Sequence, residues 1–219
     1  MITYIPRLKE IVSGAQSFLG RLWKGEDVVL VPQSKEAWEH QFRMGTWDDL
    51  KAGAPHTLEL ARLVLALTGE RGVRLRVLDI GCGNGGLARL LVPHADYTGI
   101  DISETAVAMA RQLVPGGRYL VARAEHLPRE QEIGQFDAFV FNESIYYMEP
   151  SVVLAHCRAH TAPGAMVFIS IFRSWRSPFL WRRVRKYLAL VDKYSITASG
   201  GTHRVWDVAV GRFRTDKVS

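Results

Sequence analysis

The sequence predicts an α/β protein with a doubly wound, mostly parallel seven-stranded sheet. Three observations support this fold class. From about residue 73 onward, short β-rich runs alternate with helical patterns, which is typical of a parallel sheet covered by helices. The first β-rich run ends in the glycine-rich stretch VLDIGCGNGG, residues 77–86. Near the end of the sequence, two strand-like runs are joined through Gly200-Gly201, which predicts an antiparallel hairpin that closes the sheet.

Before the sheet, the first 54 residues predict an N-terminal helical cap, or lid. Apolar residues recur at helical spacing between Ile5 and Leu22, and a second helical pattern covers residues 34–50. The second pattern carries three aromatic residues and a histidine: Trp38, Phe42, Trp47 and His40. We therefore expect two units, the cap or lid over residues 1–54 and a sheet domain over residues 55–219.

The elements of the sheet domain follow in order. Pro55 opens a helix through Leu67 that leads into the first strand. Five strands are predicted at residues 75–80, 96–100, 118–122, 136–142 and 164–172. Helices are predicted between them at residues 86–92, 103–114 and 151–161. Ser103 and Ser151 are the expected N-caps of the last two helices. The hairpin strands are predicted within residues 193–199 and 203–213.

The formal net charge is +6, and much of the positive excess lies between Arg173 and Lys193. Helical spacing predicts a basic helix over residues 179–193 with these apolar side chains turned inward: Phe179, Leu180, Val184, Leu188 and Val191. In one interpretation the basic residues form a solvated helix face. In the other they bind an anionic acceptor, a carrier protein or nucleic acid. The basic residues concerned are Arg182, Arg183, Arg185 and Lys186.

Composition excludes several classes of protein. The 219 residues are 47% hydrophobic and 23% charged, which is ordinary for a globular protein. The sequence has no apolar run near the roughly 18 to 20 residues of a membrane span, so we expect no membrane partner. The start, MITYIPRLKE, lacks the apolar core of a secretory signal, and we expect a cytoplasmic location. Two cysteines, Cys82 and Cys157, form neither a disulfide framework nor a metal-binding set, and we expect no metal.

The glycine-rich stretch predicts a ligand site. Asp79 ends a buried strand, Gly81 and Gly83 let the backbone approach a ligand, and a helix begins near Gly86 with its free N–H groups facing back. A tight turn without a ligand is the structural alternative. Asp101 ends the next strand, twenty residues after Gly81, where a carboxylate accepts hydrogen bonds from ribose hydroxyls. A nucleoside ligand is predicted, with NAD and S-adenosylmethionine as the two candidates.

The combined motifs resemble those of the class I, Rossmann-like S-adenosylmethionine-dependent methyltransferases, in particular the small-molecule type. VLDIGCGNGGLARLL is similar to the first motif of that family, and YTGIDIS to the second. RAEHLP is similar to the segment that holds the adenine, and FDAFVFNESIYYM to the fourth motif, which lines the methyl-transfer site. The resemblance covers roughly residues 55–172 and implies S-adenosylmethionine as the cofactor.

The resemblance also implies a set of cofactor-binding residues: Asp79, Gly81, Cys82, Gly83, Asn84, Asp101, Ile102, Ala124, Glu125 and Asn142. Within this set, Asp79 and Gly81 flank the methionine portion, and Ile102 packs on the adenine. The adenine segment departs from the family pattern. Arg123 stands where many relatives carry an aspartate, and an arginine can only donate. Adenine recognition then rests on Glu125 or on the backbone of Ala124, or is looser than usual.

The stretch NESIYY supplies candidate catalytic residues because it follows the fourth strand at its carboxyl end, where open α/β sheets bind ligands. Glu143 is the candidate base or ammonium-orienting carboxylate, and Tyr146 and Tyr147 are candidates for bracketing the acceptor. His203, at the start of the last strand, is a further candidate. The structural alternatives are that Glu143 caps the following turn, that one tyrosine belongs to the core, and that His203 is an ordinary surface or hydrogen-bonded histidine.

The predicted function is methyl transfer from S-adenosylmethionine to a nitrogen or oxygen of a small-molecule acceptor. Specialised metabolism is one setting for such an acceptor. The prolines that nucleic-acid amino-methyltransferases carry after the fourth strand are absent from NESIYY, so we expect no nucleic-acid partner. Two alternatives remain, an NAD-binding oxidoreductase and a catalytically silent nucleoside-binding module. The intact Asp79 and Asp101 argue against the silent module.

Overall fold

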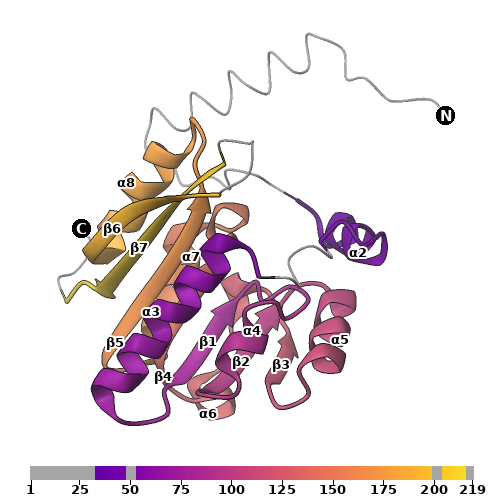
Figure 1. Cartoon of the computed structure of the whole chain (residues 1–219), viewed down its shortest axis with the longest axis horizontal. Helices are drawn as coiled ribbons and strands as arrows, with labels where there is room; N and C mark the ends of the chain where they lie inside the picture. Colours follow the sequence, from indigo (N-terminus) through magenta and orange to yellow (C-terminus); the bar gives the residue numbers. More distant parts are fainter. Residues whose placement is uncertain (1–32, 48–52, 199–203, 216–219) are drawn as a thin grey trace.

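Seven strands form one mixed sheet in the order β3-β2-β1-β4-β5-β7-β6 (Figure 1). This computed structural model describes residues 33–47, 53–198 and 204–215. The strands are β1 (Arg76–Ile80), β2 (Asp96–Asp101), β3 (Arg118–Val121), β4 (Phe136–Asn142), β5 (Thr161–Phe172), β6 (Leu188–Thr197) and β7 (Val205–Phe213). The first five strands pair in parallel, and β7 lies antiparallel between β5 and β6. The predicted fold class and hairpin are confirmed, whereas the Gly200-Gly201 turn lies outside the described residues.

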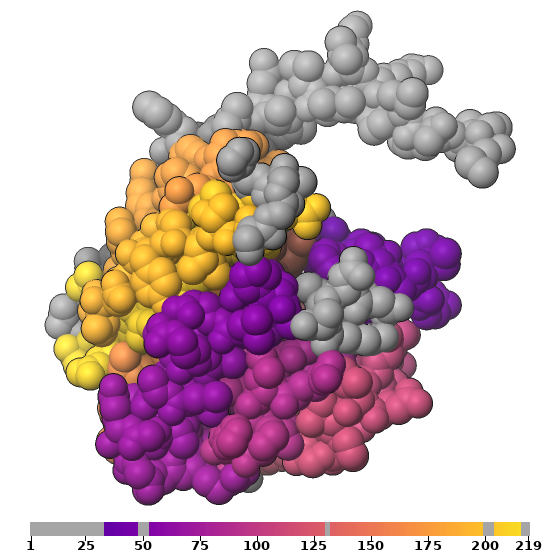
Figure 2. All heavy atoms as spheres, viewed as in Figure 1, coloured from indigo at the N-terminus to yellow at the C-terminus, as the bar shows by residue number. Residues whose placement is uncertain are grey.

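The helices cover both faces of the sheet. They are α2 (Lys35–Arg43), α3 (Pro55–Arg71), α4 (Ala88–Leu91), α5 (Glu104–Leu113), α6 (Glu130–Ile133), α7 (Pro150–Arg158) and α8 (Ser177–Tyr187). One hydrophobic cluster joins the sheet to α3, α4 and α5, and a second joins its other face to α6, α7 and α8. Figure 2 shows α3 running across the first face, between the hairpin strands and the half of the sheet that carries α4 and α5.

Alternation along the central strands explains why both faces are apolar. In β4, Phe139 and Phe141 belong to one hydrophobic cluster, whereas Ala138 and Val140 belong to the other. Successive side chains of a strand point to opposite faces, so a strand covered on both sides is a continuous apolar run. This is why the runs in the sequence predicted buried parallel strands.

Several element boundaries differ from the predicted ones. The Ser103 hydroxyl accepts a hydrogen bond from the Ala106 N–H, which confirms Ser103 as an N-cap. The predicted cap at Ser151 is wrong, because α7 already begins at Pro150 with Glu149 at the N-cap. Proline suits the first helical position because its fixed φ matches the helix and its missing N–H is not needed there. The helix predicted to end at Leu67 continues to Arg71.

The basic segment contains a helix followed by a strand. The predicted helix over residues 179–193 is wrong beyond Tyr187, since pairing with β7 begins at Leu188. Val191, predicted to face inward, is 63% exposed on β6. Arg183 is buried, whereas the other three basic residues of the predicted cluster, Arg182, Arg185 and Lys186, are exposed. Arg183 therefore does not contribute to an exposed basic face of α8.

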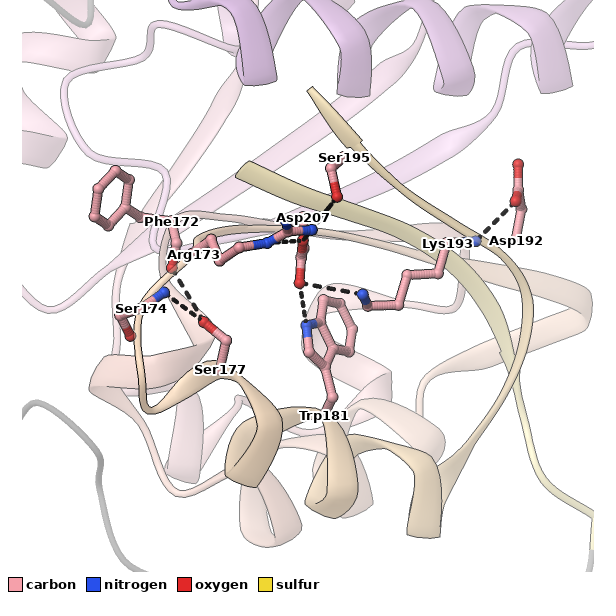
Figure 3. Close-up of polar contacts among 9 residues, drawn as sticks. All are labelled: Phe172, Arg173, Ser174, Ser177, Trp181, Asp192, Lys193, Ser195 and Asp207. Atoms are coloured by element: carbon pink, nitrogen blue, oxygen red, sulfur yellow. Dashed lines mark hydrogen bonds and ion pairs between the residues drawn. The ribbon is translucent and has the colours of Figure 1, made fainter. Parts of the chain in front are cut away.

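The buried carboxylate of Asp207 fixes α8 to the hairpin (Figure 3). Its Oδ1 atom accepts hydrogen bonds from Arg173 Nε at 2.9 Å and Ser195 Oγ at 3.1 Å. Its Oδ2 atom accepts one from Trp181 Nε1 at 2.9 Å and lies 3.1 Å from Lys193 Nζ. Burial alone acts to raise the pKa of Asp207, but its cationic and indole partners outweigh burial and hold that pKa below its ordinary value.

Candidate active site

A cavity of about 700 Å³ opens at the carboxyl ends of the parallel strands. It lies where open α/β sheets bind ligands, beside the loop after β1 and the end of β2. Its polar wall comprises Gln33, His56, Asp101, Arg123, Glu125, Asn142, Glu143, Ser144 and Arg204. Its aromatic wall comprises Trp38, Phe42, Trp47, Tyr146, Tyr147, Phe172 and Trp206. One cavity thus joins the predicted cofactor loop to the predicted acceptor residues.

The glycine loop needs a residue without a side chain where it meets the end of β4. Gly81 has φ 77°, and a Cβ there would lie 2.6 Å from the Cβ of Ser144. The N–H groups of Gly81 and Cys82 both donate to the Ile100 carbonyl at 2.9 Å, which fixes the loop against β2. Gly83 also has a positive φ, 54°, and lines the cavity. The glycines therefore keep the loop thin and bring its backbone to the cavity wall.

Asp101 connects the loop to the next helix through both carboxylate oxygens. Its Oδ2 accepts the Gly83 N–H at 2.9 Å, and its Oδ1 accepts the Ser103 N–H at 2.9 Å. Burial raises the pKa of Asp101, while these backbone hydrogen bonds act in the opposite direction. A carboxylate has about four acceptor positions, so capacity remains for hydroxyl groups in the cavity.

The structure brings most of the predicted cofactor residues to the cavity wall: Gly81, Gly83, Asp101, Ile102, Ala124, Glu125 and Asn142. Three others lie behind the wall. Asp79 is buried and accepts a 2.5 Å hydrogen bond from Tyr97, and burial raises its pKa to about 7. Cys82 is buried beside Gly99. Asn84 is buried and donates to the Trp47 carbonyl at 2.9 Å.

Helix α2 is held over the glycine loop by contacts that the sequence analysis did not predict. The Glu39 carboxylate accepts the N–H groups of Glu104 and Thr105, at 2.5 and 3.2 Å, at the start of α5. Lys35 and Glu104 form an ion pair at 2.6 Å. Figure 1 shows α2 beside α5, and these contacts place the aromatic residues of α2 on the cavity wall.

Glu143 has an unusual backbone and a partly engaged side chain. Its φ of 57° is rare for a residue other than glycine, and such strain is often found at functional sites. Its Oε2 accepts a hydrogen bond from Tyr146 at 3.0 Å, while its buried Oε1 has no hydrogen-bond partner among the described residues. Burial raises the pKa of Glu143 to about 7, although Tyr146 and Trp206 act to lower it.

Aromatic rings line the space next to Glu143. Tyr146 and Tyr147 pack with ring centroids 4.5 Å apart, and Trp38 meets Tyr147 edge-to-face at 4.7 Å. The predicted candidates Glu143, Tyr146 and Tyr147 therefore lie together. His203 lies outside the described residues, and His40 is exposed on α2, away from the cavity lining.

His56 is a cavity residue that the sequence analysis missed. It is only 3% exposed and stacks on Trp206 with ring centroids 4.7 Å apart. Neither ring nitrogen has a hydrogen-bond partner among the described residues, and burial lowers the pKa of His56 to about 4. No local sequence pattern marks His56 as a site residue, because its stacking partner Trp206 comes from the other end of the sequence.

The strand order with its reversed β7, the glycine loop after β1 and the carboxylate ending β2 agree with the resemblance to the class I, Rossmann-like S-adenosylmethionine-dependent methyltransferases. More particularly, residues 78–169 match a family model described as a methyltransferase domain. A ubiquinone biosynthesis O-methyltransferase from Bordetella avium (strain 197N) is 34% identical over 144 residues, 62% of this chain and 59% of that protein. The chain thus spans less than two thirds of this relative's length.

Solved structures are similar in fold at lower sequence identity. The N-methyltransferase NodS from Bradyrhizobium japonicum WM9, in complex with S-adenosyl-L-homocysteine, has a TM-score of 0.63 at 17% identity. That similarity covers 80% of this chain and 98% of NodS. The [4+2]-cyclase SpnF has a TM-score of 0.54 at 16% identity, over 70% of this chain and 81% of SpnF. Because the fold carries different activities, function has to be argued from the site.

Two further searches of the described residues concern membranes and metals. In residues 33–47, 53–198 and 204–215, no helix has both the length and the apolar character needed to cross a membrane. The same part of the chain contains no group of three or more histidine, cysteine, aspartate or glutamate side chains placed to hold a metal ion.

Proposed function

We propose that the protein transfers the methyl group of S-adenosylmethionine to a hydroxyl oxygen of a small aromatic acceptor. The observation that carries this proposal is the single cavity in which a glycine loop and Asp101 stand beside Glu143 and a wall of aromatic rings. The half of the cavity beside the glycine loop and Asp101, the cofactor half, suits a nucleoside cofactor. The half beside Glu143 and the aromatic rings, the acceptor half, suits a flat acceptor that has to lose a proton. A cytoplasmic location remains part of the proposal.

The cofactor half is proposed to include the loop backbone at Gly81 and Gly83 and the Asp101 carboxylate. Asp101 has acceptor capacity left after its two backbone hydrogen bonds, which suits the ribose hydroxyls. The Glu125 carboxylate lies 3.9 Å from the Arg123 guanidinium, so that acid already faces a cation. We therefore assign adenine recognition to the backbone around Ala124, which is buried on the cavity wall.

The cofactor supplies an activated methyl group, so the protein's own residues have to align the acceptor and exclude water. Trp38 and Tyr147 offer ring faces and edges that suit an aromatic acceptor. Glu143 is proposed to take the hydroxyl proton, because a carboxyl whose pKa is about 7 is partly ionised at neutral pH. Oxygen is preferred over nitrogen because the relative with 34% identity is named an O-methyltransferase, whereas the 17% likeness to NodS concerns the fold.

The N-terminal residues 1–54 are proposed to act as the lid over this cavity. The described part of that segment supports the proposal, since Gln33, Trp38, Phe42 and Trp47 line the cavity. Anchoring of α2 to α5 through Glu39 keeps these aromatic residues over the glycine loop.

An acceptor scan with methyl-labelled S-adenosylmethionine tests the proposed reaction. Catechols, simple phenols and matched anilines would be offered at equal concentration, and label in the extracted product would be counted. Labelled methyl ethers from the hydroxyl compounds support the proposal. Label only in N-methylated products, or label in no product, contradicts it.

A further inference from the structure

The acceptor half of the cavity contains two polar side chains with buried atoms that have free hydrogen-bonding capacity. Both ring nitrogens of His56 and the Oε1 atom of Glu143 lack a partner among the described residues. Both side chains line the same cavity, and His56 is 97% buried, since its exposed fraction is 3%. Buried polar atoms in native proteins are almost always hydrogen-bonded, so a ligand group or solvent has to satisfy these atoms.

Contacts from three elements bring the two side chains to one place. Trp206, on β7, stacks on His56 at an interplanar angle of 27°, and the same indole acts on the Glu143 carboxyl and lowers its pKa. The residues next to them in sequence are also joined, because Asn142 Nδ2 donates to Thr57 Oγ1 at 2.9 Å. The end of β4 and the start of α3 are thereby fixed to each other.

The chemistry of the pair matches a hydroxyl group. Because burial keeps His56 neutral near pH 7, its ring offers one N–H donor and one acceptor nitrogen. The Glu143 carboxylate is an acceptor when ionised. A hydroxyl group has one O–H to donate and lone pairs to accept, so it can engage both residues at once. An ether of the same shape can accept from His56 but has no proton for Glu143.

We propose that His56 and Glu143 form the subsite for the acceptor's hydroxyl group, with His56 donating to the hydroxyl oxygen and Glu143 Oε1 accepting its proton. This inference rests on the proposed function. In the transfer, the O–H bond breaks and its proton goes to Glu143 as the new oxygen–methyl bond forms. The sulfur–methyl bond breaks at the same time, and its electron pair stays on sulfur. His56 is thus a catalytic residue that holds the attacking oxygen in place.

Equilibrium binding of paired probes tests this subsite without turnover. Catechol and its dimethyl ether, veratrole, would be titrated into the full chain saturated with S-adenosylhomocysteine. NMR shifts of the tryptophan indole N–H signals give both dissociation constants, even when binding is weak. Wild-type protein should prefer catechol by roughly fivefold, the effect of one net hydrogen bond. His56→Phe keeps a ring against Trp206 but no N–H, so both probes should bind roughly fivefold more weakly. Glu143→Leu removes the acceptor that only catechol engages, so in that variant the preference should fall to about one.

Two further variants make the test specific. His156→Phe makes the same substitution at an exposed position on α7 and should keep both wild-type dissociation constants. His56→Gln keeps an N–H donor and should keep part of the affinity for both probes, which covers the case in which His56→Phe folds poorly. Unchanged affinities in His56→Phe, an unchanged preference in Glu143→Leu, or no preference for catechol in wild-type protein overturns the subsite. Failure to bind S-adenosylhomocysteine would instead contradict the proposed function, so the two failures are distinguishable.

Discussion

Two carboxylates in the cavity, those of Asp101 and Glu143, differ in how their oxygens are engaged. Asp101 uses both oxygens to hold backbone N–H groups, one of them in the glycine loop. Glu143 uses one oxygen for Tyr146 and leaves the other without a partner in the described part of the chain. The first arrangement favours a fixed anion that organises a binding loop, and the second favours a group that exchanges a proton with a ligand.

Asp101→Ala should weaken binding of S-adenosylhomocysteine. The substitution removes the acceptor of the Gly83 N–H and the proposed ribose contacts. Hydrogen bonds to a charged group contribute about 1.5 to 3 kcal/mol, which corresponds to a loss of roughly 10- to 150-fold in affinity. Isothermal titration calorimetry measures this directly. Asp192→Ala on the exposed β6 serves as the control and should bind normally. Wild-type affinity in Asp101→Ala would show that the ribose lies elsewhere.

Glu143 should give the reaction a pH dependence. If its ionised form takes the proton, kcat/KM rises with pH and levels off above a pKa of about 7. Glu143→Gln should lower the rate roughly a hundredfold or more and remove this rise. Tyr146→Phe deletes a hydrogen bond that lowers the pKa of Glu143, so its profile should shift to higher pH. A wild-type profile that is flat between pH 5 and 9 would exclude Glu143 as the base.

The raised pKa of Glu143 also makes the stability of the folded protein depend on pH. The folded-state pKa of about 7 lies above the ordinary value of 4.5, so the folded protein binds this proton more tightly than the unfolded chain does. The stabilising effect of protonation is therefore complete below pH 4.5 and is lost as the pH rises through 7. Glu143→Gln should flatten this part of the stability profile.

At the scale of elements, α8 and the hairpin depend on Asp207. Asp207→Asn leaves Trp181 and two cations without their shared anion. The cations are partly exposed, at 49% and 26%, so water compensates them in part, and the expected loss is about 2 kcal/mol. The depressed pKa of Asp207 means that this stabilisation is present at neutral pH and is lost as the pH falls through its folded-state pKa. Urea unfolding should show a smaller difference between variant and wild type at pH 3, below the ordinary pKa of 3.8, than at pH 7.

Also at this scale, Glu39 tests whether α2 contributes to binding as a lid. Glu39→Ala removes the acceptor for the N–H groups of Glu104 and Thr105 and should release α2 from α5. We expect S-adenosylhomocysteine to bind several-fold more weakly, while the melting temperature of the sheet domain changes little. Glu36→Ala, on the exposed side of the same helix, is the matched control. Equal affinities for both variants would mean that α2 has no role in cofactor binding.

At the scale of the whole molecule, patterns within single elements predicted most of the fold. The parallel strands were visible because each is a short apolar run between helical patterns. The glycine loop follows one of these strands directly, and Asp101 ends the next. The basic segment was partly mispredicted because Leu188 and Val191 fit helical spacing, whereas long-range pairing with β7 makes them a strand. Only tertiary packing unites the rest of the site, since His56 meets Trp206 from the opposite end of the described chain.

The most direct test of the central claim is calorimetry of the full chain with S-adenosylhomocysteine, S-adenosylmethionine and NAD. The site predicts that both sulfur compounds bind with micromolar dissociation constants and that NAD does not bind measurably. It also predicts that binding depends on the thin loop, so Gly81→Val, which would drive a side chain into Ser144, should abolish it. Tight binding of NAD with no response to either sulfur compound would contradict the account.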